Sequence, residues 1–169
     1  MFKHRRLSVI LSALILSGCA PDGADPAALD RDIRCTVNVS GDRSYSAELE
    51  RVDNTGWNVK LTSPESAKGI EIGYMNDGLC SFTVQGHTIV YTEADIPGGG
   101  VFDLVLSAAD NCIENRGVSF VKQGGKNVAK GEIRGMDFTA LSENGCITSI
   151  EVGSRIKAEF SYLPDKEDK

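Results

Sequence analysis

The sequence predicts a mainly β domain (α+β): a curled antiparallel sheet, or half-barrel, of roughly ten strands wrapped on one central helix. Three observations predict this fold class. Apolar and polar residues alternate through most of the chain, which is typical of strands with one buried face. Short turns rich in Gly, Asn and Asp separate these segments, which favours antiparallel pairing of consecutive strands. A single segment, residues 101–113, has apolar residues at helical spacing and can cover the sheet.

The first three segments predict a meander. Residues 33–39, 45–49 and 57–61 each alternate apolar with polar side chains, and short turns at 41–42 and 53–56 join them. Alternation with a period of two places all the apolar side chains of a strand on one face. We therefore expect three neighbouring antiparallel strands whose apolar faces point the same way.

Residues 63–69, with the sequence Ser-Pro-Glu-Ser-Ala-Lys-Gly, interrupt the alternation. A proline near the start and a glycine at the end of such a segment suit a single helical turn. The strand pattern resumes over 70–74, 80–84 and 87–91, with turn sequences between them.

Residues 101–113 form the predicted helix. Its apolar residues recur at steps of three and four and mark one broad face: Val101, Phe102, Leu104, Val105, Leu106, Ala108, Ala109 and Cys112. Asp103, Asp110 and Asn111 form a polar side that we expect to face solvent. The preceding glycines 98–100 predict a hinge or access loop, and anion binding at the helix N-terminus is the alternative.

The strand pattern returns after Gly117. The segments with alternating or mostly apolar character are residues 118–120, 128–134, 136–140, 147–152 and 156–162. We expect them to form a second meander, so that the helix is an insertion between two sets of strands.

The N-terminal residues have the order of an export signal. Lys3, His4, Arg5 and Arg6 form a basic head, and an apolar run of ten residues follows, Leu7–Leu16. This run is too short for a membrane-spanning helix, which needs about 20 apolar residues, and is typical of a signal peptide. Leu16-Ser17-Gly18-Cys19 resembles the bacterial lipobox, which implies a lipid on the Cys19 thiol and cleavage just before it. The alternative is a signal cut elsewhere, with Cys19 incidental.

We divide the chain into four parts. Residues 1–18 are the predicted lipoprotein signal peptide, 19–30 the lipidated cysteine and a flexible tether, 31–163 a single β-rich domain, and 164–169 a charged tail. The tether has no periodicity and holds two prolines, a glycine and three aspartates. The 151 residues that remain after the signal are enough for one domain with a sizeable core.

The charge balance argues against a nucleic-acid partner and against electrostatic attachment to a membrane. Three of the 18 basic residues lie in the signal, which leaves 15 basic against 24 acidic residues and a net charge of −9. Nucleic-acid binding requires a basic surface, so we expect no nucleic-acid partner. An acidic domain also gains no attraction from anionic lipids, and its membrane attachment would depend on the lipid at Cys19.

Four cysteines remain in the predicted mature domain: Cys35, Cys80, Cys112 and Cys146. An even number in an exported chain predicts two disulfides, whose pairing the sequence leaves open. Free buried thiols are the alternative. A zinc site is disfavoured because the spacings are long and His87 is the only histidine of the mature chain.

Three stretches between residues 46 and 70 carry a family resemblance. Ser46-Ala47-Glu48-Leu49, then Gly56-Trp57-Asn58-Val59-Lys60-Leu61 and Pro64-Glu65 through Lys68-Gly69-Ile70, resemble small lipoproteins common in clostridia-like bacteria. The order of elements resembles the half-barrel of the lipoprotein-carrier (LolA-like) superfamily. This resemblance implies that acyl chains or other lipids are held between the curved sheet and helical cover.

Large apolar side chains on the predicted inner faces are candidates for a hydrophobic pocket. We expect them on strand faces or on the helix, where a filled core is the alternative to a pocket: Trp57, Tyr74, Phe82, Tyr91, Phe102, Leu106, Phe138 and Phe160.

The sequence offers no catalytic motif. GxSxG, HExxH and phosphate-loop patterns are absent. His87 begins a predicted strand directly after a turn, and a histidine in that position is more often solvated than catalytic. We expect no enzymatic activity, no metal and no cofactor. The sequence predicts an exported lipoprotein, anchored facing outward in the cell membrane, or in an outer membrane where one exists. We expect it to bind a hydrophobic ligand. The alternative is a protein-interaction module of the envelope with a filled core.

Overall fold

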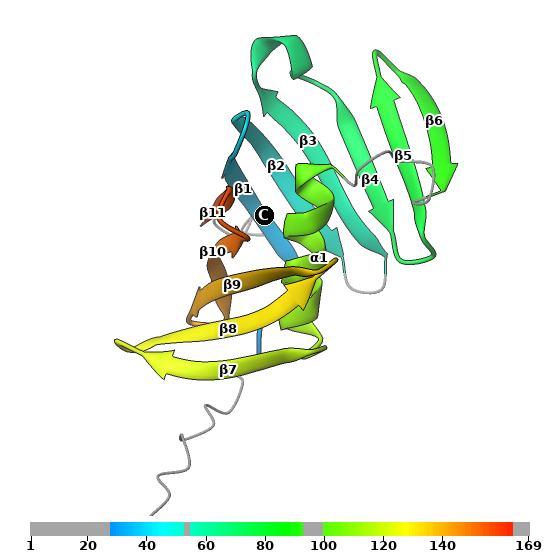
Figure 1. Cartoon of the computed structure of the whole chain (residues 1–169). Helices are drawn as coiled ribbons and strands as arrows, with labels where there is room; N and C mark the ends of the chain where they lie inside the picture. Colours follow the sequence, from blue (N-terminus) through cyan, green and yellow to red (C-terminus); the bar gives the residue numbers. More distant parts are fainter. Residues whose placement is uncertain (1–27, 53–54, 93–99, 164–169) are drawn as a thin grey trace, which may run out of the picture.

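The computed structural model describes residues 28–52, 55–92 and 100–163. Within them lies one antiparallel sheet of eleven strands, curled around one α-helix (Figure 1). The predicted fold class is confirmed, with eleven strands in place of roughly ten. The signal, Cys19, glycines 98–99 and the tail lie outside the described residues. No helix in the described ranges has the length and apolar character needed to cross a membrane.

The first half of the sheet precedes the helix. Its elements are β1 (Ile33–Ser40), β2 (Tyr45–Val52), β3 (Gly56–Ser63), the 3-10 turn η1 (Glu65–Ala67), β4 (Glu71–Met75), β5 (Leu79–Val84) and β6 (His87–Thr92). The helical turn expected over residues 63–69 is therefore present as η1.

The helix and the second half of the sheet follow. These elements are α1 (Val101–Ile113), β7 (Val118–Gln123), β8 (Lys126–Ile133), β9 (Met136–Glu143), β10 (Cys146–Val152) and β11 (Ile156–Tyr162). The helix has the bounds that the apolar spacing predicts.

The strand order is β6-β5-β4-β3-β2-β1-β11-β10-β9-β8-β7. The first and last strands pair at the centre of the sheet, with Cys35 opposite Tyr162 and Ser40 opposite Lys157. Strands β6 and β7 are the two edges, and α1 connects them. Pairing of β1 with β11 brings the hairpin turns of the two halves together, although more than 100 residues separate them in sequence.

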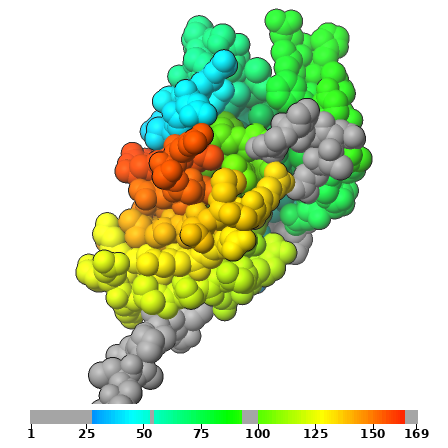
Figure 2. Space-filling view, in the orientation of Figure 1, coloured from blue at the N-terminus to red at the C-terminus, as the bar shows by residue number. Residues whose placement is uncertain are grey.

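The core lies between α1 and the concave face of the sheet. Strand β1 alternates buried and outward residues as predicted, and Val37 and Val39 are almost fully buried. The helix contacts β8, β9 and β10, and Ala108 and Ala109 at its centre have no exposed surface. Small side chains at these positions allow close approach of helix and sheet. In Figure 2 the second half of the sheet, yellow to red, closes over the helix.

The ribbon formed by β5 and β6 lies beyond the cover of the helix (Figure 1). Every residue of β6 is exposed, and Ile89 and Val90 each keep 54% of their surface in solvent. In β6, therefore, the alternation of apolar and polar residues does not correspond to a buried face.

The ordered contacts of the domain begin before residue 31, the predicted boundary. Leu29 packs against the core, and the backbone amide of Asp30 donates to the carbonyl of Gly145 in the β9–β10 turn at 3.0 Å. The last residues of the predicted tether therefore contact the domain.

Candidate ligand-binding site

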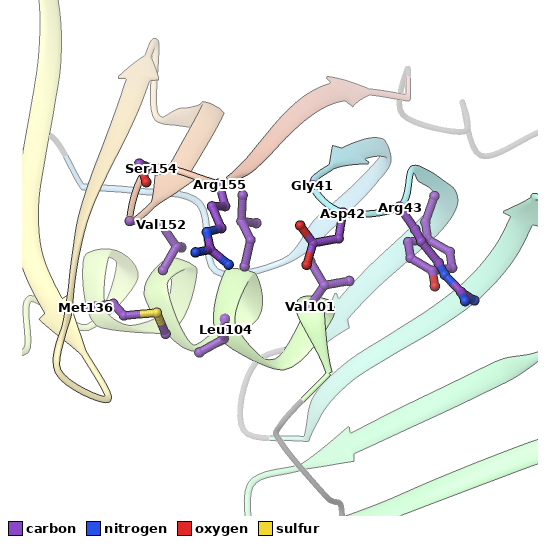
Figure 3. Close-up of a pocket in the computed structure, with 12 residues that line it drawn as sticks. Gly41, Asp42, Arg43, Val101, Leu104, Met136, Val152, Ser154 and Arg155 are labelled. Carbon is purple, nitrogen blue, oxygen red and sulfur yellow. The ribbon is translucent and has the colours of Figure 1, made fainter.

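An open cavity of about 660 Å³ lies at the N-terminal end of α1 (Figure 3). Its volume is in the range of small-molecule sites, which is roughly 300–1,000 Å³. Its walls are the first turn of the helix, the turns that join β1 to β2 and β10 to β11, and the first residue of β9. The lining residues are Gly41, Asp42, Arg43, Tyr45, Val101, Leu104, Met136, Val152, Gly153, Ser154, Arg155 and Ile156.

The hairpin turns are held close together by glycine and by backbone hydrogen bonds. A Cβ atom at Gly41 would lie 3.4 Å from the carbonyl oxygen of Arg155, so the β1–β2 and β10–β11 turns meet there. Gly153 has a φ of 57°, which favours glycine, and its amide donates to the carbonyl of Asp137 at 2.8 Å. These contacts hold the backbones of the turns that carry the rim side chains.

The floor of the cavity is apolar. Leu104 and Val152 are buried, while Val101, Met136 and Ile156 are half-buried and border the open space. Along one wall, Tyr45 packs edge-on against Phe102 with ring centroids 6.1 Å apart. Such a surface favours an apolar group of a ligand over water.

The rim of the cavity is charged. Asp42, Arg43 and Arg155 are exposed, and none of them forms a salt bridge with another described residue. In Figure 3 the side chains of Asp42 and Arg155 both point toward the helix, and Arg43 points away from them. The cavity therefore combines an apolar floor with ionic groups at its mouth.

The C-terminal end of α1 is closed by a buried charge cluster. Arg51 on β2 is only 3% exposed, and its Nε donates to Asp110 Oδ1 at 2.9 Å. A second nitrogen, Nη1, donates to the carbonyl of Arg31 at 2.6 Å. Trp57 Nε1 donates to Asp110 Oδ2 at 3.0 Å, and the guanidinium lies 5.8 Å from the Trp57 ring centroid. Glu114 Oε1 lies 3.5 Å from Arg51 Nη2.

We predicted that the polar side of the helix faces solvent, but Asp103 and Asp110 on that side contact the sheet. Asp103 is buried, and its Oδ2 lies 2.7 Å from an Arg134 guanidinium nitrogen. Asp110 is half-buried, and burial raises its pKa, although the hydrogen bonds from Arg51 and Trp57 oppose the shift. The prediction was wrong because the sheet curls far enough to bring Arg51 to Asp110 and Arg134 to Asp103.

The predicted pocket residues lie elsewhere in the domain. Trp57, Phe102, Leu106, Phe138 and Phe160 are buried in the core, Tyr74 and Phe82 are half-buried, and Tyr91 is 41% exposed on β6. None of the eight lines the cavity at the N-terminal end of α1. Trp57, Tyr74 and Leu106 border a smaller space of about 270 Å³ that also contains Asp103 and Asp110. The buried core thus contains Trp57, Phe102, Leu106, Phe138 and Phe160, while Phe82 and Tyr91 lie outside it.

All four cysteines of the domain are free thiols, where the sequence predicted two disulfides. For the three cysteines on strands, the strand order explains the difference, because a disulfide needs Cα atoms within about 7 Å and neighbouring strands are about 4.8 Å apart. Cys35 on β1 and Cys146 on β10 have β11 between them, and Cys80 on β5 is four strands from β1. Burial raises the pKa of Cys35 and of Cys112 to about 12, so both stay protonated at neutral pH.

His87 is exposed at the start of the edge strand β6 and lines none of the cavities described above. Within the described ranges, no three His, Cys, Asp or Glu side chains gather closely enough to hold a metal ion. Neither observation supplies a catalytic group, and the absence of activity stays a prediction.

Sequence reasoning missed both charged sites. One signal for the rim was present, since both turns carry the pattern Gly-X-Arg: Gly41-Asp42-Arg43 and Gly153-Ser154-Arg155. A signal for Arg51 was also present, because it continues the inward alternation of Ala47 and Leu49.

No protein-family model matches this chain, and no curated protein matches it significantly. Among solved structures, it is similar to the LolA superfamily protein NE2245 from Nitrosomonas europaea. That match has 10% sequence identity and a TM-score of 0.42, and covers 83% of this chain and 88% of the other. The likeness is too weak to carry a fold or a function over to this chain, whose fold is described by its own strand pairing.

Proposed function

We propose that this chain is an exported lipoprotein, anchored through a lipid on Cys19, whose domain binds a hydrophobic ligand without catalysis. The observation that carries the binding function is the cavity of about 660 Å³ at the N-terminal end of α1. Its apolar floor is formed jointly by the helix and by the ends of strands, at residues other than the eight pocket candidates of the sequence analysis.

The filled core supports this location. Four of the aromatic side chains expected to line a pocket belong to the buried core, and the Arg51 cluster lies at the C-terminal end of the helix. These four are Trp57, Phe102, Phe138 and Phe160. The larger of the two spaces described between helix and sheet is the one bordered by Val101, Leu104 and Met136, about 660 Å³ against about 270 Å³. A ligand there removes apolar surface from water, which stabilises the complex by roughly 25 cal/mol per Å² of apolar area.

Binding of the neutral apolar dye Nile red tests this function. We expect the wild-type chain to increase the dye fluorescence and Val101→Trp to abolish the increase, because a larger side chain at this half-buried wall position fills the cavity. The matched control is Val121→Trp on the edge strand β7, 37% exposed and outside the cavity, which should bind the dye like the wild type. Equal dye binding by Val101→Trp and wild type would place the site elsewhere.

The anchor rests on the order of basic head, apolar run and Leu16-Ser17-Gly18-Cys19. A net charge of −9 in the mature part offers no electrostatic route to an anionic membrane. Fractionation of cells that express Cys19→Ser tests the proposal, since the variant should leave the membrane fraction. Recovery of Cys19→Ser with membranes in wild-type amounts would contradict lipid anchoring.

A second candidate function, protein binding, is favoured by the β5–β6 ribbon. Strand β6 is an open edge without a Lys, Arg, Asp or Glu, and Ile89, Val90 and Tyr91 are exposed on it. Edge strands usually carry charges that prevent pairing with other chains, and an uncharged edge can accept an extended strand of a partner.

The charge substitution Ile89→Lys tests this candidate. Affinity capture of an envelope protein by wild type and by Val121→Lys on the opposite edge, but not by Ile89→Lys, would support it. Equal capture by all three chains would contradict it.

A further inference from the structure

The mouth of the cavity concentrates positive charge in an acidic molecule. Arg43 and Arg155 come from two neighbouring turns that both have the sequence Gly-X-Arg, and neither forms an ion pair with a described residue. Asp42 is the one carboxylate among the lining residues, so the lining carries a net charge of +1. The mature part of the chain as a whole carries −9.

We infer that the ligand of this cavity is a singly charged anionic amphiphile. Its apolar chain would lie on Val101, Leu104 and Met136, and its anionic head would contact the guanidinium of Arg155, with Arg43 adding positive charge nearby. This inference rests on the proposed function, because it assumes that the cavity binds a ligand and specifies its chemistry.

Arg155 is the residue placed to bind the head. Its side chain points from the β10–β11 turn toward the helix and the floor of the cavity, whereas Arg43 points away (Figure 3). A guanidinium donates charge-assisted hydrogen bonds to carboxylate or phosphate oxygens, often two at once. A head at Arg155 therefore leaves the attached chain against the apolar floor.

The helix adds to the preference for negative charge. The cavity lies at the N-terminal end of α1, where aligned peptide dipoles give a partial positive charge. The capping residue, Gly100, offers no side chain to the first backbone amides. The acidic residue of the first turn, Asp103, is paired with Arg134 at 2.7 Å, which offsets its repulsion of an anion.

Asp42 limits the charge of the ligand. Its carboxylate and the Arg155 guanidinium point toward the same region of the helix in Figure 3. With one negative and two positive groups in the lining, a single negative charge neutralises the rim. A cation gains nothing from this arrangement.

Calorimetric titration of the full chain with three ten-carbon probes tests the inference. We expect decanoate to bind about tenfold more tightly than 1-decanol, the increase given by one exposed charge-assisted hydrogen bond, and decyltrimethylammonium to bind more weakly than both. Arg155→Gln should weaken decanoate about tenfold and leave 1-decanol unchanged, while Arg155→Lys recovers part of the loss. Arg34→Gln, an exposed arginine outside this cavity, should bind all probes like the wild type.

The outcomes separate this inference from the function on which it rests. Equal affinities for decanoate and 1-decanol would overturn the anionic preference and leave hydrophobic binding intact. Binding of none of the three probes would overturn both. Loss of 1-decanol binding in Arg155→Gln would show a general disturbance of the cavity and overturn the role of the guanidinium. Acetate that binds as tightly as decanoate would identify a simple anion site and overturn the amphiphile.

Discussion

An arginine lies near each end of helix α1, but one is buried and paired and the other is exposed. At the C-terminal end, Arg51 is 3% exposed and bonds to Asp110, to the Arg31 carbonyl and to the face of Trp57. At the N-terminal end, Arg155 is exposed at the mouth of a cavity and has no described ionic partner. Arg51 is paired with groups of the protein itself and so contributes to the stability of the fold. Arg155 has no such partner among the described residues and is available to a ligand.

The energetic consequences of the two arrangements differ. Burial of a guanidinium is costly unless carboxylates and carbonyls replace its water, so the Arg51 cluster stabilises the fold only when complete. The solvated Arg155 carries no such cost, and its removal should affect binding rather than folding. The comparison therefore predicts which substitutions unfold the domain and which change only its ligand affinity.

The largest expected effect is that of Arg51→Met. This change leaves Asp110 half-buried without its guanidinium, and we expect the free energy of unfolding to fall by about 3 kcal/mol. Arg155→Gln, at the other end, should change it by less than about 0.5 kcal/mol. Urea unfolding of both variants and the wild type measures the difference. Equal losses for the two arginines would contradict the distinction between the ends.

The next effect is the loss of stability in alkali. Burial raises the pKa of Cys112, near the closed end, to about 12 from an ordinary value of 9.0. Between these values the unfolded thiol loses its proton and the folded thiol keeps it. The contribution of the Cys112 thiol to the free energy of unfolding is therefore complete below pH 9 and decreases as the pH rises toward 12. At pH 10.5 the decrease is about 2 kcal/mol.

Urea unfolding at pH 7 and pH 10.5 measures this contribution. Cys112→Ala should show a smaller decrease between the two pH values than the wild type, whatever its stability at pH 7. An identical decrease in both chains would show that the Cys112 thiol ionises equally in the folded and unfolded states.

A smaller effect is expected for Arg134→Gln at the open end. Arg134 is 42% exposed, so solvent screens its ion pair with Asp103, and we expect a loss of about 1 kcal/mol in unfolding free energy. Without the offsetting charge of Arg134, the buried Asp103 carboxylate should repel an anion at the helix N-terminus more strongly and weaken decanoate binding. Calorimetry of this variant with decanoate measures that change. An increase in decanoate affinity would contradict the offsetting role of Arg134.

The smallest expected effect is that of a reducing agent. Packing and charge pairs hold the domain together, and the four domain cysteines are free thiols. Dithiothreitol should therefore leave the free energy of unfolding unchanged within about 0.5 kcal/mol, whereas loss of native disulfides typically costs several times more. A marked decrease on reduction would show that cross-links are present.

The fold could be predicted from the sequence because local patterns determine its elements. The alternation in β1 and the apolar spacing of α1 specify which face of each element is buried. The site could not be predicted in this way. Residues 41–43 and 153–156 are neighbours only because the first strand pairs with the last, and no local pattern reveals that pairing.

The charged residues of the helix show a second reason for the limits of sequence reasoning. Asp103 and Asp110 occupy the polar side of an amphipathic pattern, which ordinarily faces water. Here the curled sheet supplies Arg134 and Arg51 to that side, so a polar face becomes an interior one. Periodicity distinguishes apolar from polar faces, but only tertiary structure determines what covers the polar face.

The most direct test of the account uses the methionine methyl groups. Met136 borders the cavity at the N-terminal end of α1, and Met75 on β4 borders the smaller space beside Asp110. In a chain labelled with [methyl-13C]methionine and titrated with decanoate, the NMR signal of Met136 should shift in a saturable way while that of Met75 stays in place. A shift of Met75 alone, or of neither methyl group, would contradict ligand binding at the open end of the helix.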